Sequence, residues 1–107
     1  MKSYTDISQS KTLAEILPIE SADMQLFLEE DYCIVQIKEK LQDWGGDCTI
    51  PCWSLAALLD VYPMCVGRDL GMFCCWVNHK SMCSSHFDNP VDACVDMLLL
   101  LKERNLI

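Results

Sequence analysis

Apolar residues recur at helical spacing near the end of the chain and predict a helix there. Asn89 is expected to be its N-cap and Pro90 its first residue, because an Asn side chain accepts from free backbone amides and proline fits a first turn. The apolar stripe comprises Val91, Cys94, Val95, Leu98 and Leu101. Further apolar residues widen it, so we expect this helix to be buried in a crevice or to contact a partner.

The same spacing predicts two shorter helices. Residues 12–17 follow Ser10, which is expected to cap the first of these helices, and Pro18 ends it. The second is expected from about Pro51 to Asp60, because proline suits a first helical turn and leucines recur at helical spacing after it.

Four short segments rich in strand-forming residues predict two β-hairpins. They are residues 24–28 with 32–37, and residues 70–77 with 82–87. Gly71, inside the third of these segments, predicts a bulge or a close backbone contact.

These elements predict the order α-β-β-α-β-β-α. Hairpins favour antiparallel pairing, because parallel neighbours need longer crossovers. We therefore expect an α+β fold with an antiparallel sheet of about four strands and helices packed mainly on one face. A single domain is expected over residues 11–107, after a flexible polar segment at residues 1–10.

Composition narrows the functional classes without selecting one. The chain has 107 residues, 51% of them hydrophobic, and a formal net charge of −8. An acidic chain is repelled by nucleic acids and by anionic lipids, so we expect neither as a partner. The first residues contain no apolar stretch of signal-peptide length, and no apolar run could span a bilayer, so a cytoplasmic location is expected.

The chain contains 8 cysteines, an even number that would suit a disulfide framework. Without a signal peptide, a reducing compartment is the better interpretation. Several of the cysteines have apolar neighbours, where a reduced thiol packs as a small hydrophobic group.

One group of residues resembles a metal site. Thiolate and imidazole groups are the ligands that Zn²⁺ prefers, and the second hairpin carries Cys74, Cys75, His79, Cys83 and His86. Cys74 and Cys75 point to opposite faces of a strand, so at most one of them can join a site on one face. The alternative is a cysteine-rich sheet with two surface histidines, and on that interpretation we expect no cofactor.

Cys52 is the best candidate for a nucleophile, because a helix N-terminus lowers the pKa of a thiol. His79 or His86 would have to serve as its base, and nothing in the sequence brings either one near. The alternative is a packed, unreactive thiol. No phosphate-binding loop, Ser/His/Asp order or dinucleotide fingerprint is present, so we expect no enzyme.

Three segments together resemble a known group of proteins. They are KTLAEILP with ESADM at residues 11–18 and 20–24, IPCWSLAALL at 50–59, and DNPVDACV at 88–95. This set is similar to small uncharacterised proteins encoded in prophages and mobile elements of gut Bacteroides-type bacteria. The resemblance implies a phage-like origin and carries over no catalytic residue.

The remaining expectation is a small acidic protein-interaction or accessory module, without catalysis, that binds an unidentified protein or forms a homodimer. Trp53 and Leu99 are the candidate contact residues, although a tryptophan near a helix start more often packs in the core. One alternative is a structural zinc module built on the 74–86 hairpin. Another is an acidic inhibitor that imitates nucleic acid and blocks a basic host protein.

Overall fold

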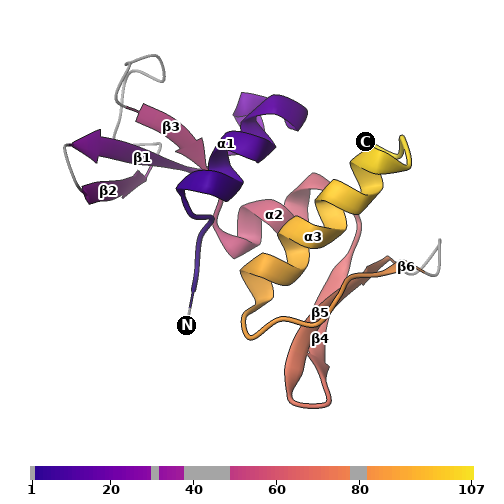
Figure 1. Ribbon diagram of the computed structural model, residues 1–107. Coiled ribbons are helices and arrows are strands. Elements are labelled where there is room, and N and C mark those ends of the chain that lie inside the picture. The colour runs from indigo at the N-terminus through magenta and orange to yellow at the C-terminus, as the bar shows by residue number, and fades with distance from the viewer. Residues whose placement is uncertain (1, 30–31, 38–48, 78–81) are drawn as a thin grey trace.

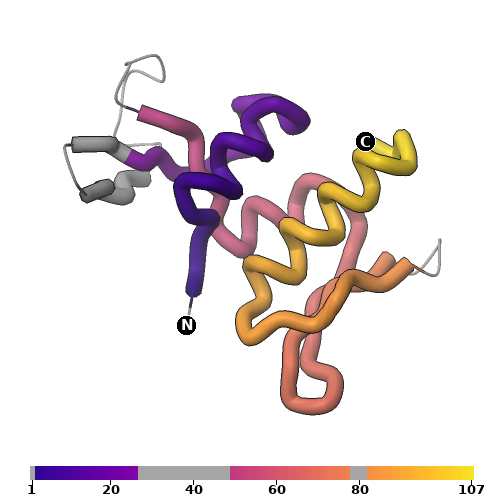
Figure 2. Tube along the Cα trace, in the orientation of Figure 1, coloured from indigo at the N-terminus to yellow at the C-terminus, as the bar shows by residue number. Residues whose placement is uncertain are grey.

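The computed structural model describes residues 2–29, 32–37, 49–77 and 82–107 (Figures 1 and 2). Its helices are α1 (Ile7–Ile16), the short 3-10 helix η1 (Ile19–Ser21), α2 (Leu55–Val61) and α3 (Pro90–Glu103). Its strands are β1 (Met24–Glu29), β2 (Tyr32–Ile37), β3 (Thr49–Cys52), β4 (Cys65–Asp69), β5 (Met72–Val77) and β6 (Met82–Cys83). The predicted α+β class is confirmed.

The strands form two antiparallel sheets, where one sheet of about four strands was expected. Their orders are β2-β1-β3 and β4-β5-β6. The difference comes from two strands that the sequence did not reveal. β3 contains Pro51, which suggested a helix start, and β4 contains Gly67, Arg68 and Asp69, which are poor strand formers.

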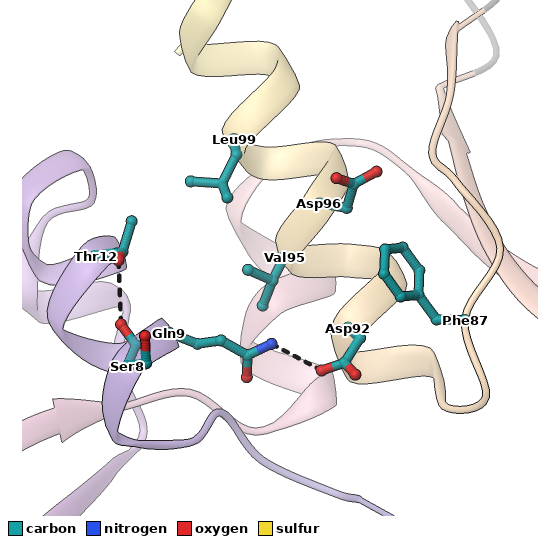
Figure 3. A pocket seen from close by; sticks show the side chains of 8 residues that line it. All are labelled: Ser8, Gln9, Thr12, Phe87, Asp92, Val95, Asp96 and Leu99. Atoms are coloured by element: carbon teal, nitrogen blue, oxygen red, sulfur yellow. Dashed lines mark hydrogen bonds between the residues drawn. The ribbon is translucent and has the colours of Figure 1, made fainter.

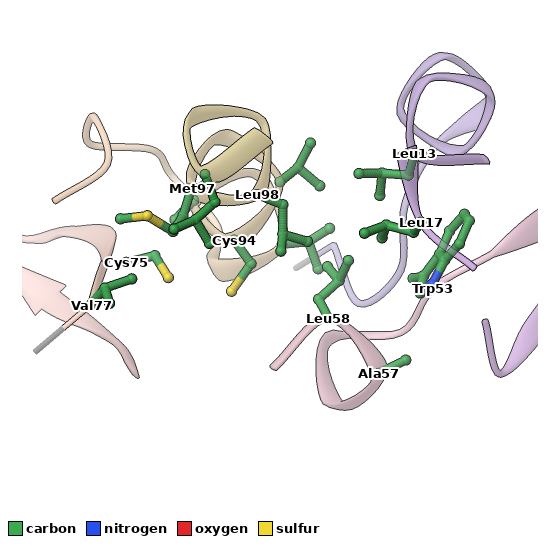
Figure 4. Packing of buried hydrophobic residues seen from close by; sticks show 14 of the residues in the cluster. Leu13, Leu17, Trp53, Ala57, Leu58, Cys75, Val77, Cys94, Met97 and Leu98 are labelled. Atoms are coloured by element: carbon green, nitrogen blue, oxygen red, sulfur yellow. The ribbon is translucent and has the colours of Figure 1, made fainter. Parts of the chain in front are cut away.

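The helices lie between the two sheets rather than on one face of a single sheet (Figure 1). α1 packs on β3, α3 packs on β4 and β5, and α2 packs on α3. The core therefore runs along the helices into the second sheet (Figure 4). Its fully buried members include Leu13, Trp53, Leu58, Cys75, Val91, Cys94, Met97, Leu98 and Leu101.

α1 begins before the predicted cap Ser10. Asp6 is the N-cap: its carboxylate accepts from the Gln9 amide at 2.8 Å, and the Gln9 side chain accepts from the Asp6 amide at 3.1 Å. Ser10 is buried inside the helix, where its hydroxyl lies 2.7 Å from that of the buried Thr5. The fold thus includes residues that were expected to form a flexible segment, because this hydroxyl pair attaches them to the core.

The second helix also begins later than predicted. Its N-cap is Ser54, whose hydroxyl accepts from the Ala57 amide at 3.2 Å, and its C-cap is Tyr62. The third helix is as predicted, with Asn89 accepting from the Asp92 amide at 2.9 Å. Eight residues of α3 are buried, so most of its apolar stripe is covered within one chain.

β4 and β5 are joined by a two-residue turn at Leu70 and Gly71, where a bulge had been expected at the glycine. Both residues have positive φ, 54° and 83°. This is the backbone of a type I′ hairpin turn, whose twist matches that of the flanking strands. The strand predicted from residue 70 therefore begins at Met72.

Candidate functional site

The two faces of β5 have different surroundings. Cys75 and Val77 belong to the core cluster beneath α3 (Figure 4), whereas Cys74 lies on the opposite, outer face. On that outer face the β4 residue opposite Cys74 is Gly67, and Asp69 is opposite Met72. The expectation that Cys74 and Cys75 point to opposite faces is confirmed.

A bulge after β6 brings His86 beside Cys74. Trp76 pairs with Cys83, but Phe73 pairs with Phe87, so three residues at 84–86 face two on β5. The Ser84 amide donates to the Cys75 carbonyl at 2.7 Å, which holds the start of the bulge. Bulges of this kind change the direction of a side chain next to a regular ladder.

Three side chains meet on the outer face of this second sheet. One ligand atom from each of Asp69, Cys74 and His86 lies within 4.8 Å of the other two. His86 Nε2 is 3.0 Å from Asp69 Oδ2, and the Cys74 thiol hydrogen-bonds with the thiol of Cys83. Burial raises the pKa of the Cys74 thiol, and the Cys83 thiol beside it adds to the increase.

The five metal-ligand candidates therefore separate. Cys74 and His86 come together, Cys83 neighbours Cys74 without joining the group, and His79 lies outside the described residues. Cys75 is excluded, because it is fully buried on the core face against Cys94, and the hydrogen bond to Cys94, together with burial, raises its pKa. The sequence did not identify Asp69 as a candidate ligand, because its strand was not predicted. The signal that could have identified it is an acidic residue directly before a two-residue turn.

Cys52 does not meet the requirements of a nucleophile. It lies at the end of β3 rather than at a helix start, and its side chain is 0% exposed. Its thiol donates to the Thr5 carbonyl at 3.4 Å and accepts from the Thr5 hydroxyl at 3.5 Å. Burial raises the pKa of this thiol, which favours the unreactive form. His86 lies in the segment after β6 and pairs with Asp69 of β4.

The two candidate contact residues have opposite positions. Trp53 is 0% exposed, and its indole Nε1 donates to the Ser21 hydroxyl at 3.0 Å, so it packs in the core and offers no surface to a partner. Leu99 is 39% exposed on α3. It lines a pocket of about 350 Å³ between α1, α3 and the segment before α3 (Figure 3).

This pocket combines apolar walls with acidic groups. Figure 3 shows Val95 and Leu99 directed from α3 toward α1, with Phe87 and Asp96 on the other side of α3. Asp92 completes the lining at the start of α3, where the Gln9 side chain donates to it at 2.7 Å. Its polar lining consists of hydroxyl, amide and carboxylate groups, from Ser8, Thr12, Gln9, Asp92 and Asp96.

No family model, curated protein or solved structure matches this chain. Within the described residues, the helices are too short to cross a lipid bilayer.

Proposed function

We propose that this protein is a small acidic interaction module of a phage or mobile element. It acts in the cytoplasm without catalysis, and it holds a segment of another protein in the pocket between α1 and α3. The observation that carries the proposal is Leu99, a large apolar side chain left 39% exposed at the pocket while Leu98 and Leu101 are fully buried.

The lining defines the chemistry of the bound segment. On the α1 side of α3, Val95 and Leu99 offer apolar contact to one inserted side chain, in a pocket of about 350 Å³. Asp92 and Asp96 also line this pocket, and the whole chain carries a net charge of −8. A segment that places an apolar side chain next to a lysine or arginine complements both properties.

The local structure supports a surface that exists before the partner arrives. The Gln9 side chain joins α1 to Asp92 of α3, and Lys2 donates to the same carboxylate at 2.8 Å. These contacts fix the two helices relative to one another at the pocket. A preorganised pocket loses little entropy on binding, which favours affinity.

Selection of random displayed peptides on the wild-type protein tests the proposal. We expect enriched peptides to pair an apolar residue with lysine or arginine. We also expect Leu99→Arg to weaken their binding at least about tenfold, because it removes an anchoring contact and places a cation in the pocket. Leu70→Arg is the matched control, since Leu70 is 93% exposed on the distant hairpin turn and the charge change is the same.

The acidic-inhibitor alternative predicts a different result. If charge alone attracts the partner, both arginine variants weaken binding equally, and added salt abolishes it. That outcome would overturn the pocket proposal. Selected peptides without apolar residues would overturn it as well.

A further inference from the structure

The outer face of the second sheet is separate from the α1–α3 pocket and carries a group of metal-ligating side chains. We propose that Asp69, Cys74 and His86 bind a zinc ion there. Their ligand atoms come from three successive segments of one sheet and lie within 4.8 Å of one another. The site is independent of the function proposed for the pocket.

The separation of the ligand atoms is close to what zinc requires. Tetrahedral zinc has bonds of about 2.0–2.3 Å, which places its ligand atoms about 3.3–3.8 Å apart. Asp69 and His86 are already 3.0 Å apart, and both side chains are exposed, so small rotations bring all three groups to a common centre. The buried thiol of Cys74 supplies the fixed point of the site.

The set of donors also matches zinc chemistry. Thiolate, imidazole and carboxylate are all zinc ligands, and a thiolate discriminates against magnesium and calcium, which prefer oxygen. Zinc held by three protein ligands takes water in the fourth position, and the exposed side chains of Asp69 and His86 leave that position open to solvent. Zinc binding displaces the thiol proton of Cys74 to solvent.

The backbone holds these residues in place before any ion binds. The tight turn at Leu70 and Gly71 places Asp69 next to β5, and the bulge at 84–86 turns His86 toward Cys74. Opposite Cys74 stands Gly67, where an added Cβ would come within 2.9 Å of the Trp76 ring. The glycine therefore lets the outer end of the Trp76 indole lie against the backbone of β4.

Cobalt titration of the reduced, untagged protein tests this site. We expect one Co²⁺ per chain, visible ligand-field bands of tetrahedral intensity and a thiolate-to-cobalt charge-transfer band in the near ultraviolet. Zinc should displace the cobalt and remove these bands. Cys74→Ser should abolish the charge-transfer band, because the band depends on this thiolate. It should also weaken cobalt binding at least about tenfold, since mutation of residues that only hydrogen-bond to metal ligands already lowers metal affinity by that factor.

Two further variants and one control make the test specific. Asp69→Asn and His86→Asn change exposed side chains and should keep the native circular dichroism spectrum while weakening cobalt binding by at least about tenfold. Cys65→Ser removes a cysteine from the same strand as Asp69 and should leave binding unchanged. An absent charge-transfer band, a band that survives Cys74→Ser, unchanged affinity in either exposed variant, or equal loss in the control would each overturn the proposal.

Discussion

Leu70 is the residue whose backbone conformation suits its side chain least. Its φ of 54° lies in the left-handed region, which costs an ordinary L-residue roughly 1–2 kcal/mol. Its side chain is 93% exposed and so recovers little of that cost by packing. Asparagine and glycine are the residues favoured at this position of a type I′ turn.

Leu70→Asn should therefore raise the free energy of unfolding by about 0.5–1 kcal/mol, because asparagine adopts positive φ more readily. Urea denaturation monitored by circular dichroism measures the change. Leu70→Ala serves as the control: it removes the same side chain, keeps the unfavourable φ, and should alter stability by less than about 0.5 kcal/mol. Equal stabilisation by both variants would show that exposed apolar surface, and not the backbone, is the cause.

The limit of sequence-based prediction is also visible at single residues. Asn89 and Pro90 sufficed to place α3, because capping depends on neighbours in sequence. Asp69 and Leu99 could not be assigned in the same way. The role of Asp69 depends on a bulge two strands away, and the exposure of Leu99 depends on how α1 packs relative to α3.

The start of α3 is held by a network centred on Asp92. Its carboxylate accepts from Lys2 at 2.8 Å, Gln9 at 2.7 Å and Asn89 at 2.8 Å. Burial opposes ionisation of Asp92, but these donors outweigh burial and hold its pKa below the ordinary value of 3.8. The same network connects the first residues of the chain to its last helix.

Asp92→Asn should lower the free energy of unfolding by about 1 kcal/mol at pH 7, because three charge-assisted hydrogen bonds and a favourable helix-dipole contact are weakened. A lowered folded-state pKa stabilises the protein above pH 3.8, and this contribution is lost as pH falls through the folded value. Urea unfolding should be measured at pH 7, 5 and 3. The difference in free energy of unfolding between wild type and variant should decrease only at pH 3.

Asp60→Asn is a suitable comparison for that experiment, because Asp60 is exposed near the end of α2. It should change stability by less than about 0.5 kcal/mol at every pH. A loss in Asp92→Asn that stays undiminished at pH 3 would contradict an electrostatic origin.

Strand β4 shows why the sheets were predicted incompletely from the sequence. β4 has an exposed outer side, and its Gly, Arg and Asp residues break the pattern of a strand. β4 forms a strand because it pairs with β5, whose sequence has a clear strand pattern and whose inner face packs against α3. Such pairing is a tertiary effect that overrides local propensity.

In the whole molecule, the six described cysteines form no disulfide and differ in accessibility. Cys65 and Cys83 are exposed, whereas Cys52, Cys75 and Cys94 are 0% exposed. A buried thiol reacts only when the protein opens, so its rate of alkylation reports the population of open states.

Alkylation of the native protein, followed by mass spectrometry of its peptides, should label Cys65 and Cys83 first. The three buried thiols should react about a thousandfold more slowly, as expected for opening free energies of roughly 4–5 kcal/mol. In denaturing urea all five should react at similar rates, which provides the control. Rapid native labelling of Cys52, Cys75 or Cys94 would contradict the placement of these residues in the core.

Cys74 and Cys75 are adjacent in the chain, but they lie on opposite faces of β5 and have different neighbours. Any small apolar residue that fills the space beneath α3 can replace Cys75, so alanine or valine is expected there in divergent copies of this gene. Cys74 is under no such packing constraint from α3, and its retention or loss should follow that of His86 and Asp69. Because successive side chains of a strand point to opposite faces, the outer face of β5 can change its chemistry while the inner face keeps its packing against α3.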